Sequence, residues 1–510
     1  MSPDVKTLAQ IAAELQGYDP QALSADDVLA FLSRLVTPVQ EAVELPLFEA
    51  LGRVLAADVV SPFDVPPHDN SAMDGYAFAG NELAPTLPTS CGSLPPEGAE
   101  LAWGGPARRS LAPGEAFELK VVGTALAGKA WQGSVKAGQC VKIMTGAIMP
   151  QGLDTVVPQE FVALQGDLIT IPAKLLKPGD NRRLRGEDLA QGKPALLKGE
   201  LLTPARLGLA ASLGLKTLKT WRPLRVAYFS TGDEILSLGE APREGAVYDS
   251  NRYTVFGMLS RLGCQVIDMG VVRDDPALLE TAFTSAAMQA DAIITSGGVS
   301  VGEADFTKTM MKKLGDVAFW RIAMRPGRPM AVGRLLPAKL QAKSAPGLHI
   351  SRAASYENNS NHEDSGAVRF AAGPPQGETA PSGGSEPHEV GSVGAILFGL
   401  PGNPVAVMVT FLAFVRPALL QMMGASATTQ PLLKARSLEA IRKKPGRTEY
   451  QRGWVSTAPD GSLQVRTTGN QGSGVLRSMA EANGLMVLHH AQGNIAVGGE
   501  VDVLMFDGAI

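Results

Sequence analysis

The stretch Asp291–Asp305, which reads DAIITSGGVSVGEAD, decides the fold that the sequence predicts. Its apolar run Ala292-Ile293-Ile294 is bounded by turn residues, which is typical of a buried strand in a parallel sheet. The run leads into Ser296-Gly297-Gly298, where the missing Cβ atoms let backbone N–H groups approach an anion closely. A helix is expected over 306–314. The strand, the glycine turn, the acid Asp305 and the helix start together predict a site for a phosphorylated, metal-bearing ligand. A tight structural turn is the alternative at this point.

Strand-like and helix-like segments alternate around this stretch, from Trp221 to about residue 425. Such alternation is typical of a mostly parallel sheet with helices on both faces. A further helix is expected to begin at Ser24-Ala25-Asp26-Asp27. The expected strands are 225–229, 265–269, 292–295, 317–322, 330–333 and 395–400, and the other expected helices are 252–262, 276–289, 306–314 and 404–423.

The other segments differ in composition and predict further domains, so the fold class is α/β plus β. One segment is rich in Gly and Pro with short strand-like pieces, and another alternates short strands with turns. A third is dense in Ser, Gly, Pro and Asn without a hydrophobic period, which is typical of disorder. The assigned units are an N-terminal tail (1–23), an α/β domain (24–36 and 221–425) with a disordered insertion (337–393), a connector (37–60 and 193–220), an inserted β-rich domain (61–192) and a C-terminal β domain (431–510).

Length, charge and cysteine usage narrow the class of protein. A chain of 510 residues is too long for one hydrophobic core, so several domains are expected. The formal net charge of −4 argues against general binding to nucleic acid or to a membrane surface. Three widely spaced cysteines form neither a disulfide framework nor a zinc pattern, which favours a reducing, cytoplasmic compartment. No signal peptide is recognised, and no stretch is expected to reach the roughly 18 apolar residues of a membrane span.

Acidic side chains follow three of the predicted strands, at the sheet edge where open α/β folds bind ligands. Glu234 ends the segment FSTGDE after the first strand, Asp274 and Asp275 follow the second, and Asp305 follows the third. Carboxylates that converge there repel one another unless they hold a cation. Mg²⁺ bound to a diphosphate fits, because Mg²⁺ takes one or two carboxylates plus phosphate oxygens, and Glu234 and Asp305 are the predicted ligands. Helix N-capping is the favoured interpretation of Asp275.

Three arginines surround a Pro-Gly turn in the segment 321–329, RIAMRPGRP. Bringing Arg321, Arg325 and Arg328 together is costly unless an anion lies between them, so this turn, with Pro329 closing it, predicts an oxyanion pocket. A surface charge run is the alternative. The segment LPGNP, 400–404, joins a strand to a helix and predicts a second phosphate-sized turn.

Three polar segments lie within the predicted β-rich domain: 69–77 (DNSAMDGYA), 143–147 (IMTGA) and 183–188 (RLRGED). Each follows an apolar or proline-containing piece. Taken alone, each is more typical of a turn than of a site.

Seven motifs taken together carry a family resemblance: FDVPPHDNSAMDGYA, IMTGA, RRLRGED, FSTGDE, SGGVSVGEAD, MRPGRP and GLPGNP. In order and spacing they resemble the MoeA-type molybdopterin molybdenumtransferases of molybdenum cofactor synthesis, a family that is similar to the gephyrin E domain. The resemblance covers about 24–507, except the loops 83–109 and 337–393.

The resemblance implies an enzyme that inserts molybdate into adenylylated molybdopterin with Mg²⁺-assisted release of AMP. It also implies a four-domain chain in an elongated homodimer, with molybdopterin adenylyltransferase as the upstream partner. The inserted domain then reaches the cleft of the other subunit. The implied residues are Asp74 and Thr145 across the dimer interface with Asp188 nearby, Glu234, Asp274, Ser300 and Asp305 around the nucleotide, diphosphate and metal, and Arg325, Arg328, Arg452 and Ser473 near molybdate.

The chain departs from the family pattern at the expected oxyanion pocket. Arg321, Arg325 and Arg328 stand where the family commonly carries lysine, and arginine keeps the charge but forms a wider, planar fork. Ala406 often corresponds to a serine, so one oxyanion donor is expected to be missing. A changed affinity for molybdate is therefore expected.

Two other functions remain as alternatives. A molybdopterin adenylyltransferase is similar in the SGG and LPGNP segments, but that family normally lacks the MDGYA and MTGA segments and the C-terminal domain. The other alternative is a non-catalytic dimeric scaffold that binds partners through residues 337–393. The complete set of acidic residues argues against a scaffold.

Overall fold

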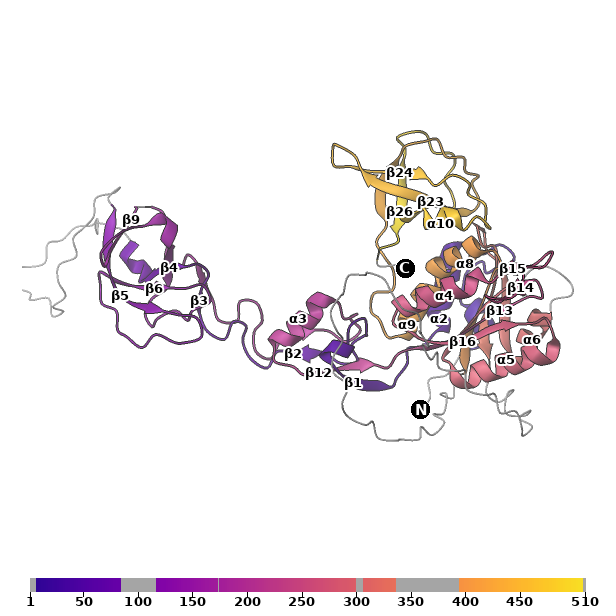
Figure 1. Ribbon diagram of the computed structural model, residues 1–510, viewed down its shortest axis with the longest axis horizontal. Coiled ribbons are helices and arrows are strands. Elements are labelled where there is room, and N and C mark those ends of the chain that lie inside the picture. The colour runs from indigo at the N-terminus through magenta and orange to yellow at the C-terminus, as the bar shows by residue number, and fades with distance from the viewer. Residues whose placement is uncertain (1–5, 84–115, 173, 300–305, 336–393, 508–510) are drawn as a thin grey trace, which may run out of the picture.

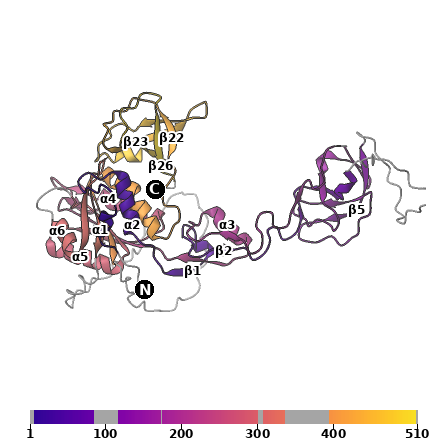
Figure 2. The same cartoon turned by 180° about the vertical axis from the view of Figure 1, so that it is seen from behind.

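The computed structural model describes residues 6–83, 116–172, 174–299, 306–335 and 394–507. They form an elongated molecule with a β domain at one end and a small connector in the middle (Figure 1). An α/β domain and a C-terminal β domain lie side by side at the other end, and the view from behind shows the same order (Figure 2). The expected insertion 337–393 and the loop 84–109 lie outside the described residues.

The α/β domain is built on a six-stranded sheet with the order β16-β13-β17-β21-β20-β18. The first four of these strands are parallel, and β20 runs antiparallel to both of its neighbours, which confirms the predicted mostly parallel sheet. β17 and β21 lie at its centre because their side chains are buried along the whole strand. The strands are β13 (Arg225–Thr231), β16 (Gln265–Val272), β17 (Ala292–Ser296), β18 (Gly315–Arg321), β20 (Pro329–Leu335) and β21 (Ala395–Leu400), and β14 (Ile235–Leu236) pairs with β15 (Val247–Tyr248) outside the sheet.

Helices cover both faces of this sheet (Figure 1). On one face, α5 and α6 place Phe283 and Met311 against Ile293 of β17. On the other face, α2, α4, α8 and α9 place Phe31, Leu259 and other apolar side chains in a second core. The bounds are α2 (Ala25–Leu35), α4 (Ser250–Arg261), α5 (Pro276–Gln289), α6 (Phe306–Leu314), α8 (Pro404–Thr410) and α9 (Arg416–Met422), with a π-helical turn (Phe411–Val415) between the last two.

The N-terminal segment 1–23, assigned as a tail from the sequence, contains a packed helix. α1 (Leu8–Ala13) buries two of its six side chains in the core of the α/β domain. Arg334 anchors the segment, because its guanidinium donates to the carbonyl oxygens of Lys6 and Leu35 at 3.2 and 2.8 Å. So short a helix has only one buried turn and shows no apolar period in the sequence.

The helix that runs through α8 and α9 corrects another expectation. Pro404–Met422 spans 19 residues with a mean hydropathy of 1.8, so one stretch is long and apolar enough for a membrane span. In the described structure, 72% of the most apolar window is buried inside the protein. Its apolar composition is therefore explained by its place in the core.

The connector is assembled from two distant stretches of chain that pair with each other. β1 (Ala42–Pro46) pairs antiparallel with β12 (Thr217–Trp221), and β2 (Val59–Val60) pairs with β11 (Pro194–Leu196). α3 (Pro204–Ser212) packs on these strands around a small apolar core of its own.

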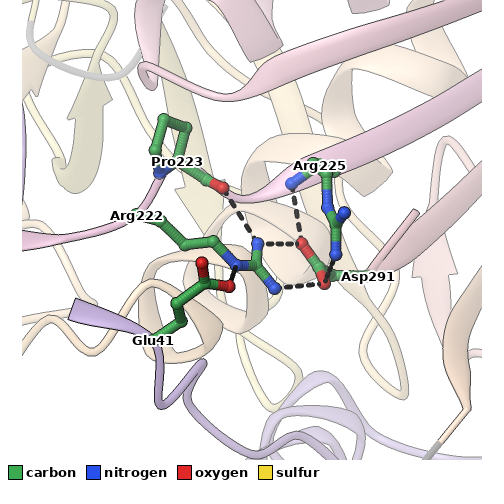
Figure 3. A network of polar contacts seen from close by, with 5 residues as sticks. All are labelled: Glu41, Arg222, Pro223, Arg225 and Asp291. Carbon is green, nitrogen blue, oxygen red and sulfur yellow. Dashed lines mark hydrogen bonds and ion pairs between the residues drawn. The ribbon is translucent and has the colours of Figure 1, made fainter. Parts of the chain in front are cut away.

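A network of ion pairs joins the connector to the sheet (Figure 3). Arg222 donates to both carboxylate oxygens of Asp291, at 2.7 and 2.8 Å, and to Glu41 at 2.8 Å. The backbone N–H of Arg225 donates to the same carboxylate at 2.8 Å. Burial acts to raise the pKa of Asp291, but these hydrogen bonds outweigh burial and hold the pKa below its usual value.

The inserted domain contains a six-stranded sheet with the order β7-β4-β6-β5-β9-β8 and an apolar cluster on each face. A two-stranded neck joins it to the connector: Val65 N donates to Leu189 O at 2.7 Å, and Ser61 N donates to Lys193 O at 2.9 Å. The strands are β3 (Asn70–Ser71), β4 (Gly75–Phe78), β5 (Phe117–Ala125), β6 (Gln139–Ile143), β7 (Thr155–Pro158), β8 (Ala163–Gln165), β9 (Leu168–Ile171) and β10 (Arg182–Arg183), of which β3 and β10 pair in the neck.

The C-terminal domain is a small barrel, because β23 pairs with both β24 and β25 and closes the order β23-β24-β22-β26-β25. A short strand of the α/β domain, β19 (Met324–Arg325), adds to this barrel by pairing parallel with β23. The bounds are β22 (Leu433–Ser437), β23 (Thr448–Thr457), β24 (Leu463–Thr467), α10 (Arg477–Ala480), β25 (Gly484–Leu488) and β26 (Glu500–Met505). The domain boundaries assigned from the sequence stay predictions.

Candidate active site cleft

A cleft of about 740 Å³ opens where the parallel strands of the α/β domain end and the C-terminal domain begins. Its walls come from the turns after β13, β17 and β21, from the Arg-Pro-Gly turn around β19, and from a loop of the C-terminal domain. The carboxyl edge of parallel strands is the usual ligand position in such folds. Seven residues predicted from the sequence meet there: Glu234, Gly297, Gly298, Arg325, Arg328, Pro329 and Ser473.

The two glycines after β17 stand where no other residue fits. A Cβ on Gly297 would lie 2.5 Å from the carbonyl oxygen of Thr231, and one on Gly298 would lie 2.5 Å from the side chain of Thr307. Both have positive φ, at 91° and 64°. The tight turn therefore presents bare backbone to the cleft. Two residues predicted beside it, Ser300 and Asp305, lie outside the described residues.

The Arg-Pro-Gly turn adds cations to the lining of the cleft. Arg325 and Arg328 line the cleft, and pairing of β19 with β23 ties this turn to the C-terminal domain. Arg321, predicted to join them, instead ends β18 opposite Pro329 and lies outside the lining of this cleft. Pairing with Pro329 holds Arg321 in β18, whereas Arg325 pairs with Glu449 of β23 and Arg328 lies in the turn that follows β19.

A smaller pocket of about 230 Å³ adjoins the cleft and shares Arg325 with it. The predicted residue Arg452 borders this pocket but is only 1% exposed. Its guanidinium donates to Ser478 Oγ at 3.0 Å and to the carbonyl oxygens of Asn470 and Gly472 at 3.2 and 3.0 Å. Burial, with a smaller contribution from nearby Arg325, lowers the pKa of Arg452 to about 10. Arg452 thus shapes the loop that carries Ser473.

The sequence reasoning missed several polar residues of the barrel that line these pockets. Arg447 reaches the cleft while its Nε donates to Glu449 at 2.8 Å, and Glu449 is 2% exposed. Gln471 lines both pockets, and Arg442 lines the smaller one. Turn signals lie beside them, since Arg442 and Arg447 flank Pro445-Gly446 and Gln471 follows Gly469 by two positions. These signals mark turns but do not show which domain the turns face, and the pairing of β19 with β23 ties the barrel to the site.

The acids after β16 do not line the cleft. Asp275 is the N-cap of α5, as favoured from the sequence, and its Oδ1 accepts from the N–H groups of Ala277 and Leu278 at 2.9 Å each. Asp274 is exposed, and its N–H donates to Asp233 Oδ1 at 3.3 Å. Within the described ranges no group of three or more His, Cys, Asp or Glu could hold a metal ion.

Three predicted residues lie in or beside the inserted domain, at the far end of the molecule (Figure 1). The N–H and the hydroxyl of Thr145 both donate to Asp74 Oδ1 at 2.7 Å. These two hydrogen bonds, the backbone one first, hold the pKa of Asp74 below its usual value. Asp188 lies in the neck, where its N–H donates to Val65 O at 3.0 Å. Within one chain, none of the three lines the cleft.

Family models match nearly the whole chain. The model described as "MoeA N-terminal region (domain I and II)" matches residues 23–214. The model described as "Probable molybdopterin binding domain" matches 227–421, and "MoeA C-terminal region (domain IV)" matches 434–506.

Relatives and solved structures show the same similarity. The chain is 35% identical over 464 residues to molybdopterin molybdenumtransferase of Haemophilus influenzae, covering 91% of this chain and 93% of that one. It is 29% identical to the Nostoc protein of the same name, covering 99% and 98%. A crystal structure of the molybdopterin biosynthesis moeA protein from Pyrococcus horikoshii has a TM-score of 0.66 at 23% identity, covering 95% of this chain and 100% of that one, so the fold is the same.

Proposed function

The chain belongs to the MoeA family of molybdopterin molybdenumtransferases, and we propose that it inserts molybdate into adenylylated molybdopterin with release of AMP. The family is one of transferases in molybdenum cofactor biosynthesis. The cleft carries the finer proposal, because a bare glycine turn and two arginines line it together. A diphosphate ester and a tetrahedral dianion are the kinds of ligand that such donors bind.

Different residues of the cleft bind different parts of the substrates. The backbone around Gly297 and Gly298 approaches the phosphate groups, and Arg325 and Arg328 attract the oxyanion. Ser473 adds a hydroxyl from the C-terminal domain. Water attacks the phosphorus attached to adenosine, the bond from that phosphorus to the bridging oxygen breaks, and AMP leaves while the pterin keeps its own phosphate. Both sulfur atoms of the pterin dithiol bind molybdenum, and their two protons leave with one molybdate oxygen as water. Arginine in place of lysine favours planar, two-point contacts with the oxyanion.

A Mg²⁺ ion belongs to this proposal. Among the residues that line the cleft, Glu234 is the one carboxylate, and Asp305 is the second ligand that the sequence predicts. This donor set fits Mg²⁺, which takes one or two carboxylates and fills its other positions with phosphate oxygens and water. Bound there, the ion supplies neutralisation of diphosphate charge.

We further propose a homodimer with shared sites. Asp74 precedes β4 and Thr145 follows β6, and the connector lies between these strands and the α/β domain of the same chain (Figure 1). The ion pairs of Arg222 with Asp291 and Glu41 hold the connector against the sheet, which keeps the inserted domain away from that cleft. A two-fold partner brings the pair to the other cleft. The substrate must come from an adenylyltransferase, the proposed upstream partner, and a cytoplasmic location is proposed for both.

AMP release tests the function. The full-length protein is incubated with Mg²⁺, molybdate and adenylylated molybdopterin, and AMP is measured by chromatography alongside molybdenum bound to pterin. We expect both products in equal amounts, and loss of both when Arg325 is changed to alanine. Asp167→Ala, which changes an exposed carboxylate of the inserted domain, is the control expected to match wild type. AMP release without bound molybdenum would contradict the proposal.

The adenylyltransferase alternative has its own readout. The family models match the N-terminal and C-terminal MoeA regions as well as the molybdopterin-binding domain, so this alternative is not favoured. Incubation with molybdopterin and ATP should yield no adenylylated pterin and no pyrophosphate. Formation of either would restore the alternative.

A further inference from the structure

Ser473 lies at a junction of two domains. The amide nitrogen Nδ2 of Asn403, in the turn after β21, donates to Ser473 Oγ at 3.0 Å. The backbone N–H of Val405 donates to the carbonyl oxygen of Ser473 at 3.1 Å. Both Asn403 and Ser473 line the cleft. The α/β domain therefore holds this residue of the C-terminal domain by its backbone and by its hydroxyl.

The side chain of Asn403 does not cap the helix that it precedes. Asn403 is the N-cap residue of α8, a position at which asparagine usually accepts a hydrogen bond from the first turn of its helix. Here it makes no such bond and reaches Ser473 instead. The turn that carries it is held from the other side, because Asn251 Nδ2 donates to Gly402 O at 2.7 Å.

The loop around Ser473 is fixed within the C-terminal domain as well. Arg452 donates to the carbonyl oxygens of Asn470 and Gly472, and the N–H of Arg452 donates to Gln471 Oε1 at 2.8 Å. The backbone on the N-terminal side of Ser473 is thus held by a buried arginine. With the backbone held from both domains, the direction of the hydroxyl proton is the main freedom left to Ser473.

A serine hydroxyl has one proton to donate and two lone pairs that accept. The N–H of Asn403 occupies a lone pair, so the proton of Ser473 is directed elsewhere. We propose that Asn403 is a positioning residue that sets Ser473 as a hydrogen-bond donor toward a tetrahedral oxyanion between Arg325 and Arg328. This inference rests on the proposed function, which makes molybdate that oxyanion. Molybdate offers only acceptors, so it requires a donor here.

Molybdate binding to the full-length protein, measured by titration calorimetry, tests the inference with matched variants. Ser473→Ala should weaken binding about tenfold, because a hydrogen bond to a charged group is lost. Asn403→Ala should weaken molybdate binding about threefold. Water can donate to Ser473 Oγ in place of the exposed amide, but it does not fix the direction of the hydroxyl proton. Asn403→Asp should weaken molybdate binding about tenfold or more, because its carboxylate accepts the proton of Ser473. The same Asn403→Ala change should raise the KM for molybdate and leave kcat near wild type.

The double variants separate orientation from structure. If Asn403 acts through Ser473, adding Asn403→Ala to Ser473→Ala should weaken molybdate binding by less than about a further twofold. In the Ser473→Ala protein, Asn403→Asp should weaken molybdate binding only through the repulsion between its carboxylate and molybdate. Ser473→Thr keeps a hydroxyl and should preserve the effect of Asn403→Ala. Equal melting temperatures of all variants show that the domains stay docked.

Additive losses in the double variant, or wild-type affinity in Asn403→Asp, would overturn the inference while leaving the proposed function standing. Unchanged affinity in Ser473→Ala would also overturn it. The proposed function can also fail by itself. If the losses of molybdate affinity are coupled but the protein releases no AMP from adenylylated molybdopterin, the inference is supported and the proposed function is overturned.

Discussion

The cleft and the inserted domain present their predicted site residues in opposite ways. In the cleft, Glu234, Arg325 and Ser473 come from distant parts of the chain and meet because sheet topology and barrel docking bring them together. In the inserted domain, Asp74 and Thr145 lie beside the neighbouring ends of the paired strands β4 and β6, and both are exposed. One region is a concave site within a single chain, and the other is an exposed polar pair that does not line that cleft in its own chain.

We propose that the two regions are halves of one site in two chains. The Asp74 carboxylate accepts both hydrogen-bond donors of Thr145, so it is held as an anion in a fixed direction. Such ordering of an exposed loop acid stabilises the fold little, since water competes for the same groups. Under the proposed dimer, this ordering serves a role at the partner's cleft.

The largest expected effect comes from removing the exposed acid. Asp74→Ala should lower AMP release on the order of 10²–10³-fold, because a charged group aimed at the reaction is lost. Its melting temperature should equal that of wild type, since the carboxylate is exposed. Asp167→Ala, an exposed acid that pairs with Lys120 in the same domain, is the matched control and should change neither quantity. A large drop in melting temperature for Asp74→Ala would assign this residue to folding instead.

The junction between the regions should matter for stability and for its pH dependence. Asp291→Asn should lower the free energy of unfolding by about 3 kcal/mol at neutral pH, because Arg222 and Arg225 lose a buried partner. The pKa of Asp291 is lowered from 3.8 in the folded state, so its contribution is complete well above pH 3.8 and is lost as the pH falls through the folded value. The difference between variant and wild type should therefore shrink in acid.

Urea unfolding at pH 7 and at pH 3 measures this difference. Glu500→Gln, which removes an exposed partner of Lys434, is the control and should leave stability unchanged at both values. A difference for Asp291→Asn that grows in acid would show that the ion pairs of Figure 3 do not hold the connector.

The smallest effect separates the glycine turns of the two regions. Gly298→Ala should cost about 2–3 kcal/mol, because its Cβ meets the side chain of Thr307 and its φ of 64° is unfavourable for alanine. Gly146→Ala in the inserted domain should cost only about 1 kcal/mol, since φ is 78° but nothing lies within 4 Å of the added Cβ. Calorimetric melting of each domain measures both. Equal costs would show that the cleft turn relaxes around the added methyl group.

Much of the sheet could be predicted because its signals are local. The apolar runs of β17 and β21, each followed by a glycine-containing turn, mark buried parallel strands and the ligand edge. The caps at Ser24 and Asp275 are also local, and both were recognised.

The rest depends on contacts between residues far apart in sequence. Arg447, Glu449 and Gln471 reach the site through the pairing of β19 with β23. These two strands lie more than a hundred residues apart in the sequence. Arg321 and Arg325 have equal charge, but they pair with different strands. Arg321 pairs with Pro329 inside the sheet, whereas Arg325 pairs with Glu449 of the barrel and lines the cleft. A helix as short as α1 lacks the length that reveals a period.

Mixing two inactive variants tests the shared site most directly. Asp74→Ala subunits keep an intact cleft, and Arg325→Ala subunits keep an intact Asp74–Thr145 pair, so a mixed dimer has one complete site. Random exchange makes half of the dimers mixed, and AMP release should return to about a quarter of wild type. Arg325→Ala mixed with Glu234→Gln, two changes in the same cleft, should stay inactive. If the first mixture also stays inactive while mass measurements confirm exchange of subunits, the two regions do not form one site across a dimer.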